Sequence, residues 1–212
     1  MKGIEIIKAP HKGEVVIERR GIEIKRERKP VNIVQAEKGT VYLVIDCSGS
    51  MSGGKLQQVK EGVIKFAEDV REYAIGLIQF HETAQHLCSP TRNISFLKKR
   101  IREIKTGTTT NMAPAISMAH DRLKGKAGRK VMVVATDGMP NGPGDPKASL
   151  EAAEKAKRDG IEIIVIGTDD ADKKFLKKLA SRENLGIKVK REEFGKTIAK
   201  VAELLPQLPK PR

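Results

Sequence analysis

The sequence predicts an α/β protein with a doubly wound, mostly parallel sheet and helices on both of its faces. After residue 40, short apolar runs alternate with segments in which apolar residues recur every three or four positions. The apolar runs are nearly continuous, which is typical of strands that helices cover on both sides. With 212 residues, 39% hydrophobic residues and 3% aromatics, the chain can form one core built mainly from Val, Ile, Leu and Ala.

Residues 1–38 follow a different pattern from the rest of the chain. Apolar and charged side chains alternate with period two over GEVVIERR and GIEIKRER, and glycine-containing turns separate these runs. We expect two or three extended segments, forming a β-hairpin extension. Two roles are open for it: covering an edge strand of the sheet, which we favour, and docking a partner. The predicted division is therefore an N-terminal extension (1–38), a main domain (39–205) and a proline-rich tail (206–212).

Strands and helices are expected to alternate through the main domain. In chain order they are a buried strand at 41–45, a helix at about 54–71, strands at 75–80 and around 85–87, helices at about 94–104 and 112–123, a strand at 131–138, a helix at about 146–158, a strand at 161–166, a helix around 175–179, a strand at 187–189 and a helix at 194–205. The short segment around 85–87 is expected to be an antiparallel edge strand.

Oxygen-bearing side chains follow the first buried strand directly. Asp46 ends the strand, and Ser48 and Ser50 follow at alternate positions, so the three side chains are expected to point toward one place. Oxygen ligands suit Mg²⁺, with Mn²⁺ or Ca²⁺ as alternatives, whereas the thiol of Cys47 is expected to point the other way. Open α/β sheets bind their ligands at the carboxyl ends of such strands. The competing interpretation is that these residues only cap the following helix.

Two later segments resemble the first one. KTGTTTNMA, at 105–113, opens a helix, and VMVVATDG, at 131–138, is a second buried strand that ends in an aspartate. The combination of Asp-x-Ser-x-Ser, a later Thr-Asn and a later Thr-Asp-Gly, in this order, resembles the von Willebrand factor type A domain with its metal-ion-dependent adhesion site. The resemblance covers about residues 40–205 and implies a Rossmann-like fold.

The resemblance also implies a set of metal ligands. They are Asp46, Ser48 and Ser50 in the first loop, Thr110 in the second and Asp137 in the third. In such domains the serines and the threonine bind the ion directly or through water, and the aspartates hold it partly through water. Thr110 is followed by Asn111, as in the family, although the run of three threonines also permits a shift of register.

The function implied by the resemblance is metal-bridged protein binding. Two aspartates and three hydroxyls would leave a bound Mg²⁺ incompletely neutralised, so an Asp or Glu of a partner could replace one of its waters. Intracellular members of the family often serve as subunits of larger assemblies, including partners of AAA-type ATPases. We therefore expect a metal-dependent protein-interaction module, a subunit or adaptor of an intracellular assembly, and not an enzyme.

Enzymatic alternatives have little support in the sequence. GxGxxG and GxxxxGK[ST] are absent, so neither a dinucleotide site nor a nucleotide-hydrolysing P-loop is indicated. A Mg²⁺-dependent phosphatase with Asp46 as nucleophile is the lesser alternative, because a carboxylate beside Mg²⁺ can attack phosphorus. Cys47 and Ser48 stand where a second acid would be expected.

Positive charge is concentrated in one part of the chain. Residues 89–130 contain eleven Lys or Arg against two acids, which is +9 of the formal +14. A field of this sign attracts acidic proteins or phosphate backbones. A basic nucleic-acid-binding protein that uses this surface is therefore the second function class.

Cys47 and Cys88 do not form the disulfide framework of a small secreted protein, so we expect reduced thiols in a cytoplasmic protein. No apolar run approaches about 18 residues, and we expect no membrane span and no signal peptide. The spacing of His81, His86 and Cys88 matches none of the usual zinc ligand pairs.

Two further acids, Asp169 and Asp170, also follow a predicted strand. We expect them to cap the next helix, which carries Phe175, and not to join the metal site.

Overall fold

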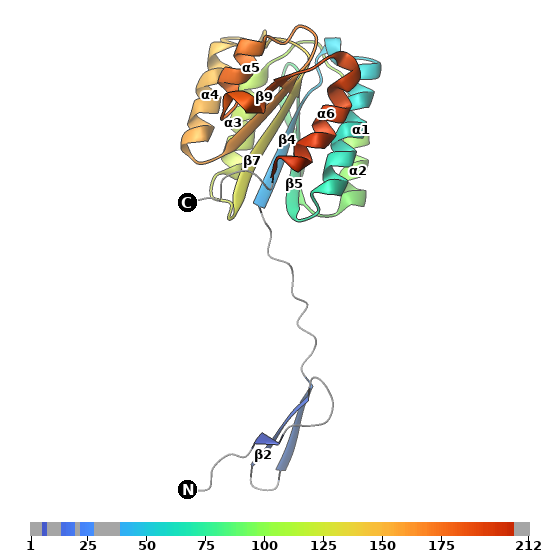
Figure 1. Ribbon diagram of the computed structural model, residues 1–212, viewed down its shortest axis with the longest axis vertical. Coiled ribbons are helices and arrows are strands. Elements are labelled where there is room, and N and C mark those ends of the chain that lie inside the picture. The colour runs from blue at the N-terminus through green and yellow to red at the C-terminus, as the bar shows by residue number, and fades with distance from the viewer. Residues whose placement is uncertain (1–5, 8–13, 20–21, 28–38, 206–212) are drawn as a thin grey trace. The chain divides into compact units, whose positions relative to one another are not determined.

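The computed structural model describes residues 6–7, 14–19, 22–27 and 39–205 (Figure 1). The chain divides into two compact units, residues 1–35 and residues 36–212. The expected proline-rich tail lies outside the described residues.

The first unit is a three-stranded antiparallel sheet in the order β1-β2-β3. Its strands are β1 (Ile6–Ile7), β2 (Glu14–Arg19) and β3 (Ile22–Glu27). Ile17 of β2 lies opposite Ile6 on one side and Ile24 on the other. Within the described residues of this unit, the three strands form one sheet.

The second unit contains a six-stranded sheet in the order β6-β5-β4-β7-β8-β9. Five strands are parallel and β6 is antiparallel to β5, as expected for the edge strand. The strands are β4 (Gly39–Asp46), β5 (Tyr73–Phe80), β6 (Ala84–Thr91), β7 (Arg129–Thr136), β8 (Glu162–Gly167) and β9 (Gly186–Lys188). The predicted doubly wound, mostly parallel sheet is confirmed.

Helices cover both faces of this sheet. The first group is α1 (Gly54–Asp69), α2 (Ile94–Arg102) and α6 (Phe194–Lys200), and the group on the opposite face is α3 (Met112–Leu123), α4 (Lys147–Arg158) and α5 (Lys173–Leu179) (Figure 1). Short 3-10 turns, η1 (Gly49–Met51), η2 (Glu183–Leu185), η3 (Arg191–Glu193) and η4 (Val201–Glu203), complete the unit. No helix in the described part of the chain has the length and apolar character needed to cross a membrane.

The central strands are buried along their whole length. Every residue of β4 and β5 is buried, because helices shield both faces. Val44 of β4 lies beside Ile78 of β5 and Val134 of β7, which forms the middle layer of the core. The sheet extends from β4 toward β5 on one side and toward β7 on the other, so the loop after β4 lies at a topological switch point.

Two glycines allow α1 and α6 to pack closely. A Cβ at Gly62 of α1 would clash with the backbone carbonyl of Gly195 in α6, and a Cβ at Gly195 would clash with the carbonyl of Gln58. The missing side chains let these two helix backbones touch.

Candidate metal centre

Asp46, the last residue of β4, is completely buried. Its Oδ1 accepts a hydrogen bond from the backbone N–H of Ser48 (2.8 Å), and its Oδ2 accepts one from the Thr136 hydroxyl at the end of β7 (2.6 Å). These two hydrogen bonds fix the carboxylate between the ends of β4 and β7.

Four of the five predicted ligands form a continuous chain of hydrogen bonds. The hydroxyls of Ser48 and Ser50 are 3.1 Å apart, and the Ser50 hydroxyl donates to Oδ1 of Asp137 at 2.8 Å. Because Ser48 is also bonded to Asp46, the chain runs from the end of β4 to the residue after β7. The alternate spacing of Asp46, Ser48 and Ser50 thus brings their oxygens together.

The threonine loop is attached to the first loop through its backbone. The N–H of Gly107 donates to the carbonyl of Cys47 (2.6 Å), and the N–H of Gly49 donates to the carbonyl of Thr108 (3.1 Å). A Cβ at Gly107 would clash with the ring of His81, so this approach requires glycine. The second loop consequently lies directly beside the first.

Thr110 is buried, whereas Thr109 is exposed. The backbone N–H of Thr110 donates to the Asn141 side chain (2.8 Å), and its carbonyl accepts from the Asn141 N–H (3.0 Å). The Thr110 side chain makes no hydrogen bond with the other four predicted ligands, all of which the structure describes. The role of Thr110 as a fifth ligand stays a prediction, which depends on its position in the loop beside Cys47 and Gly49.

The environment of Asp46 makes its negative charge costly. Burial raises the pKa of this carboxyl from 3.8 to about 6, although the hydrogen bonds from Thr136 and Ser48 act in the opposite direction. Among the described residues, no Lys, Arg or His forms an ion pair with Asp46. A divalent cation at this position would supply the missing positive charge.

The chemistry of these donors fits a hard cation. Two carboxylates and neighbouring hydroxyls are the oxygen ligands that Mg²⁺, Mn²⁺ and Ca²⁺ accept. Within the described residues there is no group of three or more His, Cys, Asp or Glu side chains arranged around a common metal position. The candidate centre thus depends on hydroxyl oxygens as much as on acids.

The family model of the von Willebrand factor type A domain matches residues 40–203. The chain belongs to this family. Among curated relatives, the magnesium-chelatase 67 kDa subunit of Heliobacterium mobile is 26% identical over 167 residues, which cover 69% of this chain and 25% of the subunit. The chain thus spans about a quarter of the length of that relative.

Solved structures share the fold of this von Willebrand factor type A domain. The corresponding domain of the pilus tip protein Mfa5 from Porphyromonas gingivalis gives a TM-score of 0.72 at 15% identity and covers 79% of this chain and 95% of its own. Proximal thread matrix protein 1 of the mussel byssus, in a structure described as having a zinc-occupied MIDAS motif, gives 0.69 at 17% identity and covers 80% of this chain and 46% of its own.

Sequence reasoning assigned Asp169 to the wrong role. The cap of α5 is Asp172, whose Oδ1 accepts from the N–H of Phe175 at 2.7 Å. Asp169 instead accepts hydrogen bonds from Lys55 (2.9 Å) and Arg191 (2.9 Å). It lies three residues too early to cap α5, and these two cations hold its pKa below the ordinary value despite partial burial.

Lys55 is the residue that sequence reasoning missed in this von Willebrand factor type A domain. Its ammonium group contacts Oδ2 of Asp137 as well as Asp169. Lys55 stands in the first turn of α1, where the helix dipole disfavours positive charge. The signal in the sequence was a lysine in the first turn of a predicted helix, directly after the loop of an expected cation site; it could have indicated that Lys55 pairs with the acids of that site.

Cys47, His81 and His86 make their side-chain hydrogen bonds outside the oxygen chain. Both cysteines are free and buried, and the Cys47 thiol donates to the carbonyl of Ile45 (3.5 Å). His81 is bonded to Glu82, and His86 lies 3.3 Å from the Tyr42 hydroxyl.

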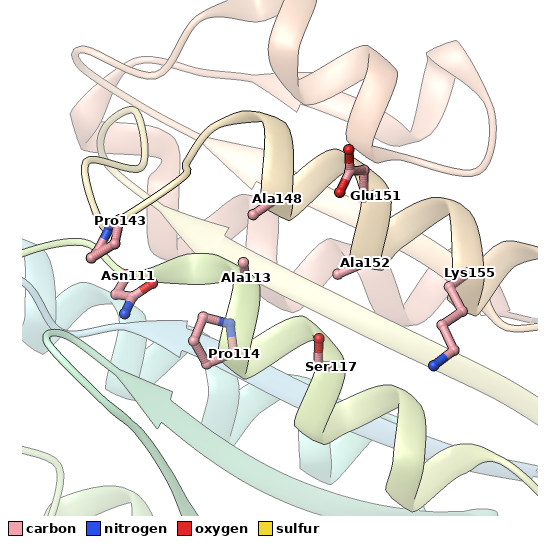
Figure 2. A pocket seen from close by; sticks show the side chains of 9 residues that line it. All are labelled: Asn111, Ala113, Pro114, Ser117, Pro143, Ala148, Glu151, Ala152 and Lys155. Atoms are coloured by element: carbon pink, nitrogen blue, oxygen red, sulfur yellow. The ribbon is translucent and has the colours of Figure 1, made fainter.

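A groove of about 460 Å³ begins next to Thr110. It runs between α3 and α4, and Figure 2 shows Asn111 and Pro143 at its loop end and Lys155 at its far end. Small side chains such as Ala113 and Ala152 line it between these two ends. One of the residues that line this groove, Asn111, belongs to the second loop.

Proposed function

We propose that this protein is a metal-dependent protein-interaction module, and not an enzyme. Its ligands are Asp46, Ser48, Ser50, Thr110 and Asp137, and its cation is Mg²⁺ first, with Mn²⁺ or Ca²⁺ as alternatives. When bound, the cation supplies a Lewis-acidic attachment point for an Asp or Glu side chain of a partner.

The observation that carries this proposal is the unpaired charge of Asp46. A buried carboxylate without a cationic partner is costly, and a stabilising role alone would be better served by an uncharged residue. The Ser48 and Ser50 hydroxyls next to it provide the oxygen surroundings in which a divalent cation removes that cost.

The relatives support a role within a larger assembly. The curated relative in Heliobacterium mobile is named as a subunit, and a structural neighbour is described with a metal in its MIDAS motif. We propose that this chain is likewise a subunit or adaptor of a cytoplasmic assembly, and that AAA-type ATPases belong to its partner class. The two free cysteines are compatible with a reducing compartment.

The groove between α3 and α4 supports the same proposal. It starts one residue after Thr110, so a partner whose acidic side chain reaches the cation can extend along the groove. Glu151 and Lys155 on α4 would give this extended contact some charge selectivity.

The basic segment at 89–130 supports nucleic-acid binding less well. Lys98 forms an ion pair with Glu68 at 2.7 Å, and Arg100 is paired with Glu103. Part of the positive charge in this segment is therefore already balanced within the protein.

Titration calorimetry and thermal unfolding with Mg²⁺ test the metal site. Metal at about 100 times its Kd should raise the unfolding free energy by roughly 2.7 kcal/mol. Ser50→Ala removes an exposed ligand hydroxyl and should abolish most of this gain, whereas Ser52→Ala, an exposed serine two residues away, should not. The absence of binding heat and of any stabilisation by millimolar Mg²⁺, Mn²⁺ or Ca²⁺ would refute the proposal.

Affinity capture tests the partner. A partner retained in Mg²⁺ should be released by EDTA, should not be retained by the Ser50→Ala protein, and should lose binding when its own contacting acid is replaced. Capture that survives both EDTA and Ser50→Ala would contradict metal bridging.

A further inference from the structure

We propose that Lys55 is an internal cation that competes with the divalent metal for Asp137 and thereby sets the metal affinity of the site. This inference rests on the proposed function and concerns the regulation of the same centre.

Lys55 contacts the carboxylate oxygen of Asp137 that Ser50 does not. Oδ1 of Asp137 accepts from the Ser50 hydroxyl, and Oδ2 accepts from the Lys55 ammonium. The side chain of Lys55 is 11% exposed and that of Asp137 is 1% exposed, so this ion pair is largely removed from water. A metal ion that uses Asp137 must therefore share this carboxylate with an ammonium group or displace it.

The position of Lys55 is not explained by the stability of its helix. Positive charge in the first turn of a helix opposes the helix dipole, and no acid precedes it in that turn. The two acids that compensate Lys55 come from the ends of other strands, Asp137 after β7 and Asp169 after β8. Lys55 is thus held by the residues of the site and not by its own helix.

The charges around the site show what Lys55 does to metal affinity. Asp46, Asp137 and Asp169 carry three negative charges, and Lys55 and Arg191 carry two positive charges, which leaves one net negative charge. Without Lys55 the same cluster would carry two. Because repulsion between an ammonium and a divalent cation acts here at short range and away from water, Lys55 weakens metal binding.

Asp169 gives Lys55 a second carboxylate. The ammonium is already 2.9 Å from Oδ2 of Asp169, so it keeps a partner when it leaves Asp137. Exchange of Lys55 for a divalent cation at Asp137 therefore leaves neither the ammonium nor a carboxylate unpaired. Arg191 shares Asp169 and fixes it in place.

Calorimetric titration with Mg²⁺ alone tests the proposal on the full chain. Lys55→Met retains the length of the side chain and removes its charge, and it should tighten Mg²⁺ binding at least about tenfold. Lys65→Met is the control, because Lys65 lies on the same helix and pairs with Asp69 in an exposed position. The control should bind Mg²⁺ as the unaltered protein does.

Thermal unfolding provides a second readout. In EDTA, Lys55→Met should lower the melting temperature, because Asp137 loses its counter-ion and Asp169 loses one of two. Saturating Mg²⁺ should recover this loss. Equal or weaker Mg²⁺ binding by Lys55→Met would overturn the proposal, since Lys55 would then be neutral toward the metal or would help to position Asp137.

A double-mutant cycle tests the role of Asp169. Asp169 has a φ of 47°, a conformation that asparagine tolerates, so Asp169→Asn is a mild change. It should weaken Mg²⁺ binding because Lys55 is then left with Asp137 alone, and most of this loss should disappear in the Lys55→Met background. An equal loss in both backgrounds would mean that Asp169 acts through its own charge, which would refute the exchange.

The outcomes separate this inference from the proposed function. If the unaltered protein binds Mg²⁺ and Lys55→Met binds it no more tightly, only the inference about Lys55 fails. If neither the unaltered protein nor Lys55→Met binds Mg²⁺, Mn²⁺ or Ca²⁺, both fail.

Discussion

Replacing Asp46 with asparagine should stabilise the protein in EDTA at neutral pH while abolishing metal binding. Burial raises the pKa of Asp46 from 3.8 to about 6, a difference of about 2 units. Each unit corresponds to about 1.36 kcal/mol, so the charged carboxylate costs the folded state about 3 kcal/mol at pH 7. Asparagine removes this cost, and up to that amount should appear as additional unfolding free energy.

Asparagine also fits the hydrogen bonds of Asp46. Its carbonyl oxygen can accept from the N–H of Ser48, and its amide can donate to the Thr136 hydroxyl. The Thr136 proton, which Asp46 accepts in the unaltered protein, can then turn to the Gly138 carbonyl 3.1 Å away. The substitution therefore changes charge with little change in shape or in hydrogen bonding.

The pH dependence has a definite sign. Because the folded-state pKa of Asp46 lies above the unfolded value, the folded protein retains the proton between about pH 4 and pH 6. This contribution favours folding at low pH and is lost as the pH rises through 6. In EDTA, the stability gained from Asp46→Asn should accordingly be largest at pH 7 and should shrink toward pH 4.

Urea unfolding in EDTA at pH 7 and pH 5 measures this difference. The control is Asp121→Asn, which removes the same charge from a side chain that is 74% exposed and should have little effect. Unchanged or reduced stability of Asp46→Asn at pH 7, or a stability gain that does not depend on pH, would refute the reasoning from burial.

Three further predictions concern the second loop, the helix packing and the charged surface. Thr110→Ala should weaken Mg²⁺ binding about tenfold or more in calorimetry, whereas Thr109→Ala, at an exposed position, should not; the reverse order would shift the ligand by one residue. Gly62→Ala should lower the unfolding free energy by about 1–3 kcal/mol in urea, because its methyl group meets the backbone of Gly195; unchanged stability would contradict the close approach of α1 and α6. Lys99→Glu should leave Mg²⁺-dependent partner capture intact, and tight DNA binding that survives EDTA and is lost in Lys99→Glu would favour the nucleic-acid alternative.

The sequence alone determined the order and type of the main elements. The long helix predicted at about 54–71 is α1, and the strand predicted at 75–80 is β5, extended by two residues at its start. These predictions succeed because apolar periodicity is a local property that burial on both faces imposes on each segment. The antiparallel edge strand was predicted as well, although β6 is longer than the segment around 85–87.

The sequence also indicated which loops meet. Asp46 and Asp137 each follow a buried strand, and parallel strands present their carboxyl ends at the same edge of a sheet. The hydrogen bonds that join Asp46, Ser48, Ser50 and Asp137 agree with this expectation. The assignment of these residues and of Thr110 as metal ligands stays a prediction for the experiments above.

Only the tertiary structure decided the electrostatics of the site. Lys55 contacts Asp137 and Asp169, which lie 82 and 114 residues further along the chain, because α1 starts at the edge of the sheet where β7 and β8 end. The raised pKa of Asp46 likewise depends on complete burial by distant segments. Local sequence patterns determine whether a segment is a helix or a strand. Charge pairing and desolvation depend instead on which elements the order of strands in the sheet brings together. For that reason the role of Asp169 was wrongly predicted and that of Lys55 was missed.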